Sequence, residues 1–371
     1  MPLAGEIIFQ RIFDLGGTFD MKKVRTLLGE MAEEGAVLST RAAPEYVSFA
    51  APIPINFAPM NLELRSEGGG TCALSARVYE VGALAIMLRF PIRGEKLADL
   101  AHYRNIQVTR KGERLKRSQF FSEVSTAIRT LLKPAYDEIF DLPVEAESYT
   151  AFCLTEASGG AETIFRDERA QISALLTGEA HPERLAPTEV EDNLKQWFSY
   201  YRDDLVVTDW DAAFVIEPSG QYEDVLYIFE VANLQLLELR KYDIYLDHTL
   251  ERGYDEYEDL FKGLPISTGR AKEMLRELSG VRMDLAKVTD EVANTAKFFG
   301  DWYVARVYMG LALKLHIKDY HAIVEEKLTT LNELYQSVLH EIDRRQTIVL
   351  EVMIVLLFLF EVIMALVGGK Y

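Results

Sequence analysis

The sequence has few of the residues on which extracellular frameworks and metal centres depend. Its 371 residues include two cysteines, Cys72 and Cys153, and six histidines. Two thiols cannot build a disulfide framework or a four-thiolate zinc site, so we expect the chain in a reducing compartment. No pair of histidines has the HExxH arrangement of a helical zinc site. We therefore predict no metal site.

Positive charge is also scarce. The chain carries 58 acidic and 40 basic residues, a net charge of −18 at pH 7. Such a chain repels phosphate backbones, so nucleic acid is not an expected partner. The glycine-rich segments lack both the Lys-Ser/Thr of a phosphate loop and the GxGxxG of a dinucleotide site, and no GxSxG elbow is present. We predict no cofactor and no enzymatic activity; the alternative is an enzyme with an unrecognised site in the first 220 residues.

The first half of the chain combines strand and helix patterns. Apolar residues recur with a period near two in the strand segments and near 3.6 in the helical ones, and only helical segments follow Pro218. The pattern predicts an α/β or α+β region over 1–218, with two subdomains divided near residue 145 as one option, and an all-helical domain over 219–346. Strands are predicted at 6–15, 36–40, 46–50, 60–66, 72–81, 83–92, 147–157, 204–210 and 211–218, and helices at 19–33, 118–139, 166–177, 189–198, 221–259, 270–297, 302–316 and from 319 onward.

The most informative segment lies near the C-terminus. Residues 348–367 read IVLEVMIVLLFLFEVIMALV, in which fifteen of twenty residues are Leu, Ile, Val or Phe. As a helix this segment is about 30 Å long, the thickness of the hydrocarbon core of a bilayer. A soluble core helix is the alternative, but helices that are apolar on all sides are uncommon in soluble proteins. We predict one transmembrane helix over 347–368, with the lipid bilayer as a partner.

The two acidic residues of this segment fall on one side of the predicted helix. Steps of 4 and 3, the spacing of a coiled-coil seam, connect Thr347, Glu351, Ile354, Phe358, Glu361, Ala365 and Gly368. A carboxylate that faces lipid is costly, so this polar seam should face another helix. That helix belongs to a second copy of the chain, which gives a homo-oligomer; alternatively, Glu351 reaches the headgroups and Glu361 meets a different protein. The polar seam comprises Glu351, Glu361, Ala365 and Gly368.

A second stripe precedes the membrane segment. Val324, Leu328, Leu331, Tyr335, Val338 and Ile342 repeat at steps of 4 and 3. This spacing is typical of a coiled coil, and packing against the chain's own helices explains it equally well. Arg344 and Arg345 precede the span and Lys370 follows it. The positive-inside rule therefore places the bulk of the chain in the cytoplasm.

The C-terminal half resembles known membrane proteins. The order of Asp301-Trp-Tyr, Tyr308, Lys327-Leu328, Leu350-Glu351 and Glu361-Val362 is similar to that in the family named "required for meiotic nuclear division". That family includes a mitochondrial inner-membrane protein that supports mitochondrial translation. The segments WFSYYRDDLVV and FEVANLQLLELRKYDIYLD resemble uncharacterised bacterial single-span membrane proteins. The resemblance covers 189–367 and implies one C-terminal span and a scaffold or tether role, with no catalytic residues. We expect the protein in the bacterial inner membrane.

Two polar clusters are candidate sites outside the membrane segment. The polar line follows one side of a leucine-rich helix and comprises Glu230, Asn233, Arg240, Asp243 and Asp247. It is either an interior network that fixes a conformation or binds a ligand or cation, or a solvated face with ion pairs. The basic patch would suit anionic headgroups or ribosomal RNA, but without interleaved aromatic residues a solvated face is favoured. It comprises Arg110, Lys111, Arg114, Lys116 and Arg117.

These features predict a membrane-anchored scaffold or adaptor with a large cytoplasmic region that self-associates and recruits a protein partner. The alternative is an oligomeric assembly that binds or conducts cations. Magnesium channels share the layout of a cytoplasmic α/β domain, long helices and a C-terminal membrane region, but they have two spans and a Gly-Met-Asn loop. This sequence has neither. A ring of Glu361 carboxylates around an oligomer axis would still suit a cation.

Overall fold

The computed structural model describes residues 3–32, 52–57, 60–64, 70–105, 107–110, 113–139, 146–157, 159–261, 269, 272–276, 278–280, 283 and 302–368. The chain divides into two units. Unit 1 comprises Met1–Lys241 and Lys287–Tyr320, and unit 2 comprises Tyr242–Ala286 and His321–Tyr371. Helices α6 (Glu223–Phe261) and α9 (Ile317–Gly368) each contribute residues to both units.

Unit 1 is built on one large sheet. Its described strands follow the order β11-β12-β13-β10-β1-β6-β5-β4-β7-β8, and β3 also pairs with β5. Among the described pairs, only β10 and β13 run parallel. A separate ribbon pairs β2 (Gly17–Phe19) with β9 (Tyr136–Ile139). The strands of the large sheet are β1 (Leu3–Asp14), β3 (Ile53–Asn56), β4 (Met60–Leu64), β5 (Gly70–Val78), β6 (Ala83–Glu95), β7 (Gln107–Arg110), β8 (Glu113–Lys116), β10 (Ala146–Ala157), β11 (Trp197–Phe198), β12 (Leu205–Thr208) and β13 (Ala212–Ile216).

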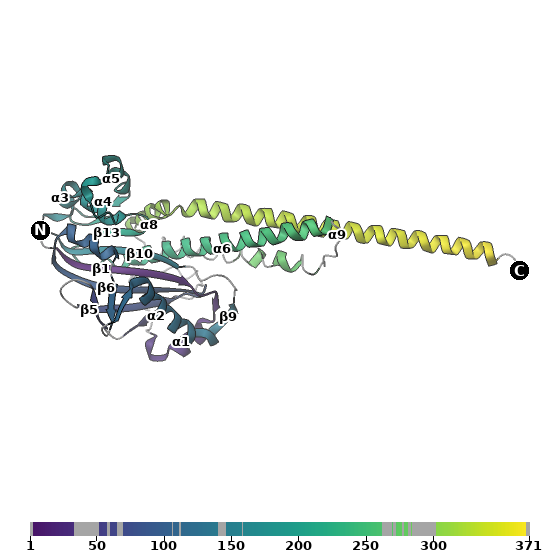
Figure 1. Ribbon diagram of the computed structural model, residues 1–371, viewed down its shortest axis with the longest axis horizontal. Helices are drawn as coiled ribbons and strands as arrows, with labels where there is room; N and C mark the ends of the chain where they lie inside the picture. Colours follow the sequence, from purple (N-terminus) through teal and green to yellow (C-terminus); the bar gives the residue numbers. More distant parts are fainter. Residues whose placement is uncertain are drawn as a thin grey trace. The chain divides into compact units, whose positions relative to one another are not determined.

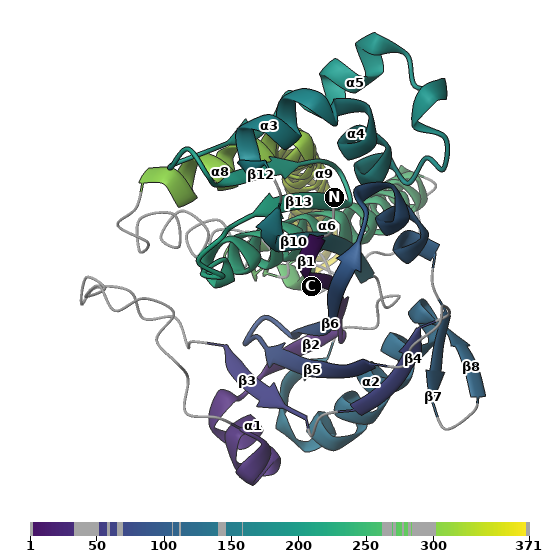
Figure 2. The ribbon, with the colours of Figure 1, turned by 90° about the vertical axis from the view of Figure 1, so that its left-hand side faces the viewer.

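The centre of this sheet is covered on both faces. On one face, Phe9 of β1 belongs to the same core as Phe120 and Phe121 of α2 (Arg117–Leu132), and α1 (Met21–Leu28) adds to that core. On the other face, Ile12 packs with Leu234 and Leu237 of α6. Figure 2 shows α2 and α6 on opposite sides of the central strands. Burial on both faces explains why these strands are continuously apolar rather than alternating.

Shorter helices accompany the β10–β13 end of the sheet (Figure 1). The 3-10 helix η2 (Leu97–Asn105) contacts α4, and α8 contacts β11 and β12. These helices are α3 (Gly160–Asp167), α4 (Arg169–Thr177), α5 (Pro187–Asn193) and α8 (Trp302–Lys314), with 3-10 turns η1 (Gly29–Met31), η3 (Lys133–Ala135) and η4 (Pro182–Arg184).

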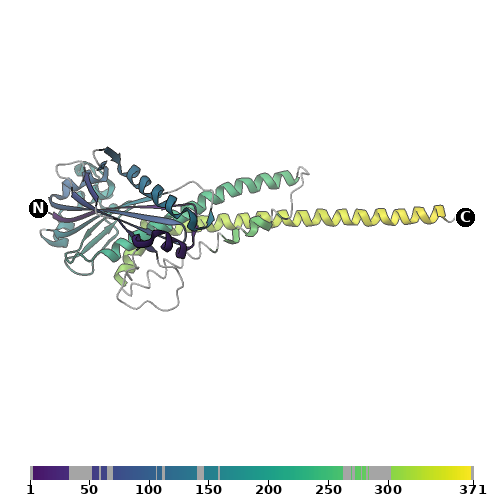
Figure 3. The same ribbon diagram turned by 90° about the horizontal axis from the view of Figure 1, so that it is seen from below.

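Unit 2 brings parts of two long helices together. A Cβ added to Gly253 of α6 would lie 2.8 Å from Leu334 Cδ2 of α9, so the small residue allows the close approach. The second stripe of α9, from Val324 to Ile342, is buried at this contact face, with exposed fractions of 0 to 6%. This burial within one chain supports packing against its own helices as the reason for the stripe. Beyond it, α9 continues as one helix to Gly368 (Figure 3).

The predicted fold class is confirmed: a sheet-rich N-terminal region precedes a helical half that ends in a long apolar helix. The division near residue 145 does not separate two sheets, because β10, which follows it, pairs with β1. The helix predicted over 118–139 ends at Leu132, since a 3-10 turn that contains Pro134 comes next and β9 follows. The strands predicted at 36–40 and 46–50, and most of the helix at 270–297, lie outside the described residues.

Gly82, in the turn between β5 and β6, has a conformation that other residues avoid. Its φ is +83°, and an added Cβ would lie 1.6 Å from the carbonyl oxygen of Gly17. Gly94 has a similar φ of +79° with nothing near its Cβ position. Gly82→Ala should lower the free energy of unfolding by about 3 kcal/mol or more, and Gly94→Ala by about 1 to 2 kcal/mol. Equal losses in urea titrations of the two variants would show that the Gly17 contact contributes nothing.

Candidate functional site

A basic pocket lies in unit 1 on the sheet face that α2 covers. Antiparallel pairing of β1 with β10 places Phe9 opposite Thr150 and Arg11 opposite Ser148. Side chains two residues apart on a strand share a face, so these four side chains form the floor of the pocket. The cavity has a volume of about 300 Å³, which is the size of a small-molecule site.

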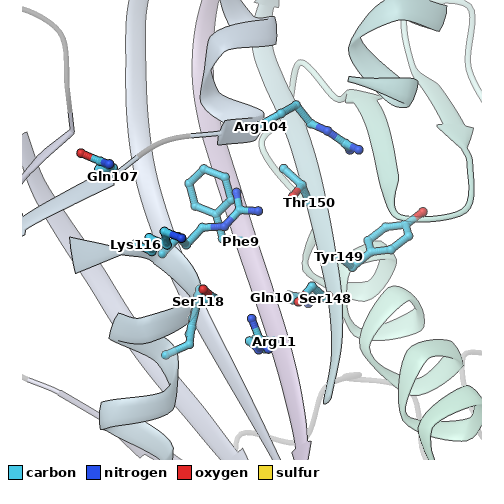
Figure 4. A pocket seen from close by; sticks show the side chains of 12 residues that line it. Phe9, Gln10, Arg11, Arg104, Gln107, Lys116, Ser118, Ser148, Tyr149 and Thr150 are labelled. Carbon is cyan, nitrogen blue, oxygen red and sulfur yellow. The ribbon is translucent and has the colours of Figure 1, made fainter. Parts of the chain in front are cut away.

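The walls of the basic pocket come from elements distant in sequence. Figure 4 shows Arg104, Lys116 and Ser118 around the floor residues. Arg104 belongs to η2, and Gln107 and Lys116 are paired across the β7–β8 hairpin. Arg117, Ser118 and Phe121 lie in the first turns of α2. The pocket therefore combines four cationic side chains with hydroxyl groups and two phenylalanine rings.

The cations of the basic pocket repel one another. Burial, and then the charges of Arg104 and Arg11, lowers the pKa of Arg117 to about 10, while Asp211 offsets part of that effect. Burial also lowers the pKa of Arg11, against the charge of Glu147. The Arg117 guanidinium carbon lies 4.5 Å from the centre of the Phe9 ring, a cation–π contact that holds the side chain in the pocket.

The predicted basic patch is divided by the fold. Lys116 and Arg117 line the basic pocket, where Arg11 and Arg104 join them, whereas Arg114 is exposed. The side chains of Arg110 and Lys111 lie outside the described residues. A wholly solvated face is therefore the wrong description for Arg117, which is partly buried.

The polar line on α6 also does not form a uniform solvated face. Glu230 and Asn233 are 1% and 2% exposed. The Glu230 carboxylate accepts hydrogen bonds of 2.5 Å from Arg77 Nη1 and from the Tyr79 hydroxyl. Burial, then the charge of Glu230, raises the pKa of Tyr79 well above its usual value, so the phenol remains a donor.

The other members of the polar line have partners elsewhere. Asn233 Nδ2 donates to the Phe229 carbonyl at 2.8 Å, and Arg240 pairs with Glu147 of β10. In unit 2, Lys327 of α9 lies 2.6 Å from a carboxylate oxygen of Asp243 and 2.6 Å from one of Asp247. The line thus consists of pairings with several different elements, and a role in binding a ligand or cation stays a prediction.

A buried ion cluster of Asp14, Glu238 and Lys241 was missed by the sequence reasoning. Lys241 Nζ lies 3.2 Å from Asp14 and 3.4 Å from Glu238, and all three side chains are at most 3% exposed. Burial lowers the pKa of Lys241, but the two carboxylates raise it by more, so the net shift is upward. Nothing in the sequence pairs residue 14 with residue 241, so only the fold reveals this cluster.

One described helix is long and apolar enough to cross a membrane. It is α9, whose most apolar 18-residue window has a mean hydropathy of 2.6 and no buried residue. Large apolar side chains from Ile348 to Met364 are 46 to 69% exposed. Glu351 and Glu361 of the polar seam are also exposed, while the side chains of Ala365 and Gly368 lie outside the described residues.

Two comparisons identify relatives of the N-terminal region. Residues 4–223 match the family described as "Uncharacterized protein MJ0711, N-terminal domain". The "Uncharacterized protein MJ0711" of Methanocaldococcus jannaschii is 24% identical over 220 residues, which are 59% of this chain and 66% of that protein. No solved structure matches the chain. The matched region contains the whole basic pocket, whereas the resemblance of the C-terminal half to the meiotic nuclear division family stays a prediction. The chain belongs to the family of the MJ0711 N-terminal domain.

Proposed function

We propose that the protein is a membrane-anchored scaffold or adaptor that self-associates and recruits a protein partner. The observation that carries this proposal is the change in character along α9. Its first part is buried in unit 2, whereas every described side chain from Ile348 to Met364 is exposed. A continuous apolar surface of this length is unfavourable in water and suits the interior of a bilayer.

An aromatic surface on unit 1 supports the adaptor role. Trp197, Tyr200 and Tyr201 are 50%, 59% and 65% exposed. The Tyr200 ring centre lies 4.7 Å from that of Tyr201 and 5.7 Å from that of Tyr303 at the start of α8. Tyr and Trp are enriched where proteins bind one another, because a large apolar area comes with a hydrogen-bonding group. This surface is our candidate for recruitment of the partner.

The charges beside the span support a cytoplasmic location for both units. Arg344 and Arg345 pair with Glu341 at 2.8 and 3.1 Å. Hydrogen bonds from the two guanidinium groups lower the pKa of Glu341 to about 2. The positive-inside rule favours retention of the side of the span that carries these two arginines in the cytoplasm of a bacterial cell.

Self-association is tested by cysteines on two sides of α9. Phe358 falls on the same side of the helix as the polar seam, between Glu351 and Glu361, and Phe360 is two residues away, on the opposite side. Both are phenylalanines, 69% and 62% exposed, and the native cysteines are buried. Phe358→Cys should give a disulfide-linked dimer in membranes under oxidation, with at least about fivefold more dimer than Phe360→Cys. Equal crosslinking of the two variants would argue against a seam-specific oligomer.

The cation-binding alternative depends on Glu361 within the same seam. A ring of these carboxylates around an oligomer axis would attract cations from water. Flux of potassium or magnesium into liposomes that contain the full-length protein, abolished by Glu361→Gln and retained in Glu351→Gln, would favour a conducting assembly over a scaffold.

A further inference from the structure

The basic pocket has a charge opposite to that of the rest of the chain. The protein has a net charge of −18, yet none of the twelve described residues that line the pocket is Asp or Glu. Four of them are Arg or Lys. Clustering like charges is unfavourable unless an opposite charge is close. The protein has many carboxylates, yet none belongs to a described residue that lines this pocket.

Three buried nitrogen atoms in this pocket lack an acceptor. Arg11 Nε, Arg104 Nη1 and Arg117 Nη1 make no hydrogen bond within the part of the chain that the structure describes. Arg104 uses its other terminal nitrogen, Nη2, to bind both oxygens of Asp211 at 2.8 Å. Buried charged donors normally have partners, and leaving one without a partner costs about 1 to 3 kcal/mol or more. The three arginines that carry these donors all line one cavity, so an anion bound there would lie close to all three side chains.

The first turn of α2 adds to the attraction for an anion. Its N-cap residue is Lys116, whose side chain makes no capping hydrogen bond. The N-terminal end of a 16-residue helix carries partial positive charge, which favours an anion at this position. Ser118 lies in the same turn, and Ser148 and Thr150 on the floor supply further hydroxyl donors.

We propose that the basic pocket binds a small organic phosphate, such as a phosphate monoester. Three guanidinium groups, several hydroxyls and a helix N-terminus match the many acceptor oxygens of a phosphate better than the two of a carboxylate. A cavity of about 300 Å³ has room for more than the phosphate, and Phe9 and Phe121 are among the residues that line it. The pocket lies within the region shared with the MJ0711 family, and the inference does not depend on the membrane anchor.

Calorimetric titration of the full-length protein in neutral detergent tests this assignment. The probes are inorganic phosphate, adenosine monophosphate and, as a neutral control, adenosine, all at one ionic strength. We expect adenosine monophosphate to bind with a Kd below about 1 mM and adenosine not to bind. Arg117→Met should weaken binding at least about tenfold. Arg114→Met changes an exposed arginine of the same patch outside the pocket and should alter the Kd less than about twofold.

A second readout separates binding from folding. Without ligand, Arg117→Met should melt no lower than the unmodified protein, because the substitution removes repulsion from Arg11 and Arg104 while it keeps an apolar stem on Phe9. If Arg117→Met does not fold, Arg11→Met replaces it, and we expect this variant also to weaken binding at least about tenfold. Absence of binding of both phosphate probes at about 10 mM would overturn the proposal. Equal weakening by Arg117→Met and Arg114→Met, or preferential binding of single-stranded RNA that both variants weaken, would also overturn it.

Discussion

Lys241→Met is expected to lower the free energy of unfolding of unit 1 by about 3 to 5 kcal/mol, because it leaves two buried carboxylates without their cation. Asp14 and Glu238 are each 1% exposed and lie 3.2 and 3.4 Å from Lys241 Nζ. Methionine preserves most of the side-chain volume, so the loss of stability comes from removal of the positive charge rather than from a cavity. Urea titration followed by circular dichroism measures the effect.

The preceding residue on the helix provides a matched control. Arg240 also pairs with a carboxylate, Glu147, but its side chain is 40% exposed. Arg240→Met should therefore cost about 1 kcal/mol or less. Adding Asp14→Asn and Glu238→Gln to Lys241→Met should restore much of the lost stability, because the uncompensated charges are then gone. No recovery in the triple variant would show that packing, not charge, explains the loss.

The same ion cluster determines how the stability of unit 1 should change with pH. The folded pKa of Lys241 is raised above its unfolded value of about 10.5. A raised pKa contributes stability that is fully present below the unfolded pKa and is lost as the pH rises through the folded pKa. The contribution of Lys241 is therefore intact at neutral pH and disappears only in strongly alkaline solution.

A chain that ends after Arg345 is expected to leave the membrane. The deleted segment contains fifteen Leu, Ile, Val or Phe residues between 348 and 367, which contribute about −4.5 to −9 kcal/mol to insertion. Glu351 and Glu361 oppose insertion by about 5 to 7 kcal/mol in total. The sum is close to balance for one helix alone, so contact along the polar seam should complete the stabilisation.

Fractionation of cell extracts measures this effect. More than about nine-tenths of the shortened chain should appear in the supernatant, and the full chain in the membrane pellet. A matched control replaces 348–367 with an unrelated apolar helix that has no acidic residue. That chimaera should return to the membrane. A cysteine placed at its position 358 should not give the disulfide-linked dimer expected for Phe358→Cys, because the chimaera has no polar seam.

The central strands, the long helices and the apolar end of α9 could be predicted because each is encoded by local periodicity. Residues 7–9 and 84–88 are apolar on both faces of the sheet, and 348–364 on all sides of the helix. Several short strands could not be predicted. Strands β7, β8, β9 and β11 have two to four residues each, too few for a period to emerge, and their pairing depends on distant strands.

The candidate sites were predictable only in part, because their residues converge from distant positions. Arg117 was predicted as part of the basic patch, but Arg11 and Arg104 lie 106 and 13 residues away from it in sequence. The register of β1 with β10 determines that Arg11 lies beside Ser148. In the same way, Glu230 was singled out by its position on α6, whereas its partners are Arg77 at the end of β5 and Tyr79 just after that strand. Isolated charged residues in strands carry no local signal of such partners.

Alkaline carbonate extraction of membranes that contain the full-length protein tests the central claim, that the exposed apolar part of α9 is seated in lipid. Carbonate at about pH 11 removes proteins held by charge or by a partner and leaves those whose apolar helices lie in the bilayer core. The intact chain should stay in the pellet and float with lipid on a density gradient. Release of the intact chain into the supernatant would contradict the membrane anchor, and with it the scaffold and the cation-conducting interpretations.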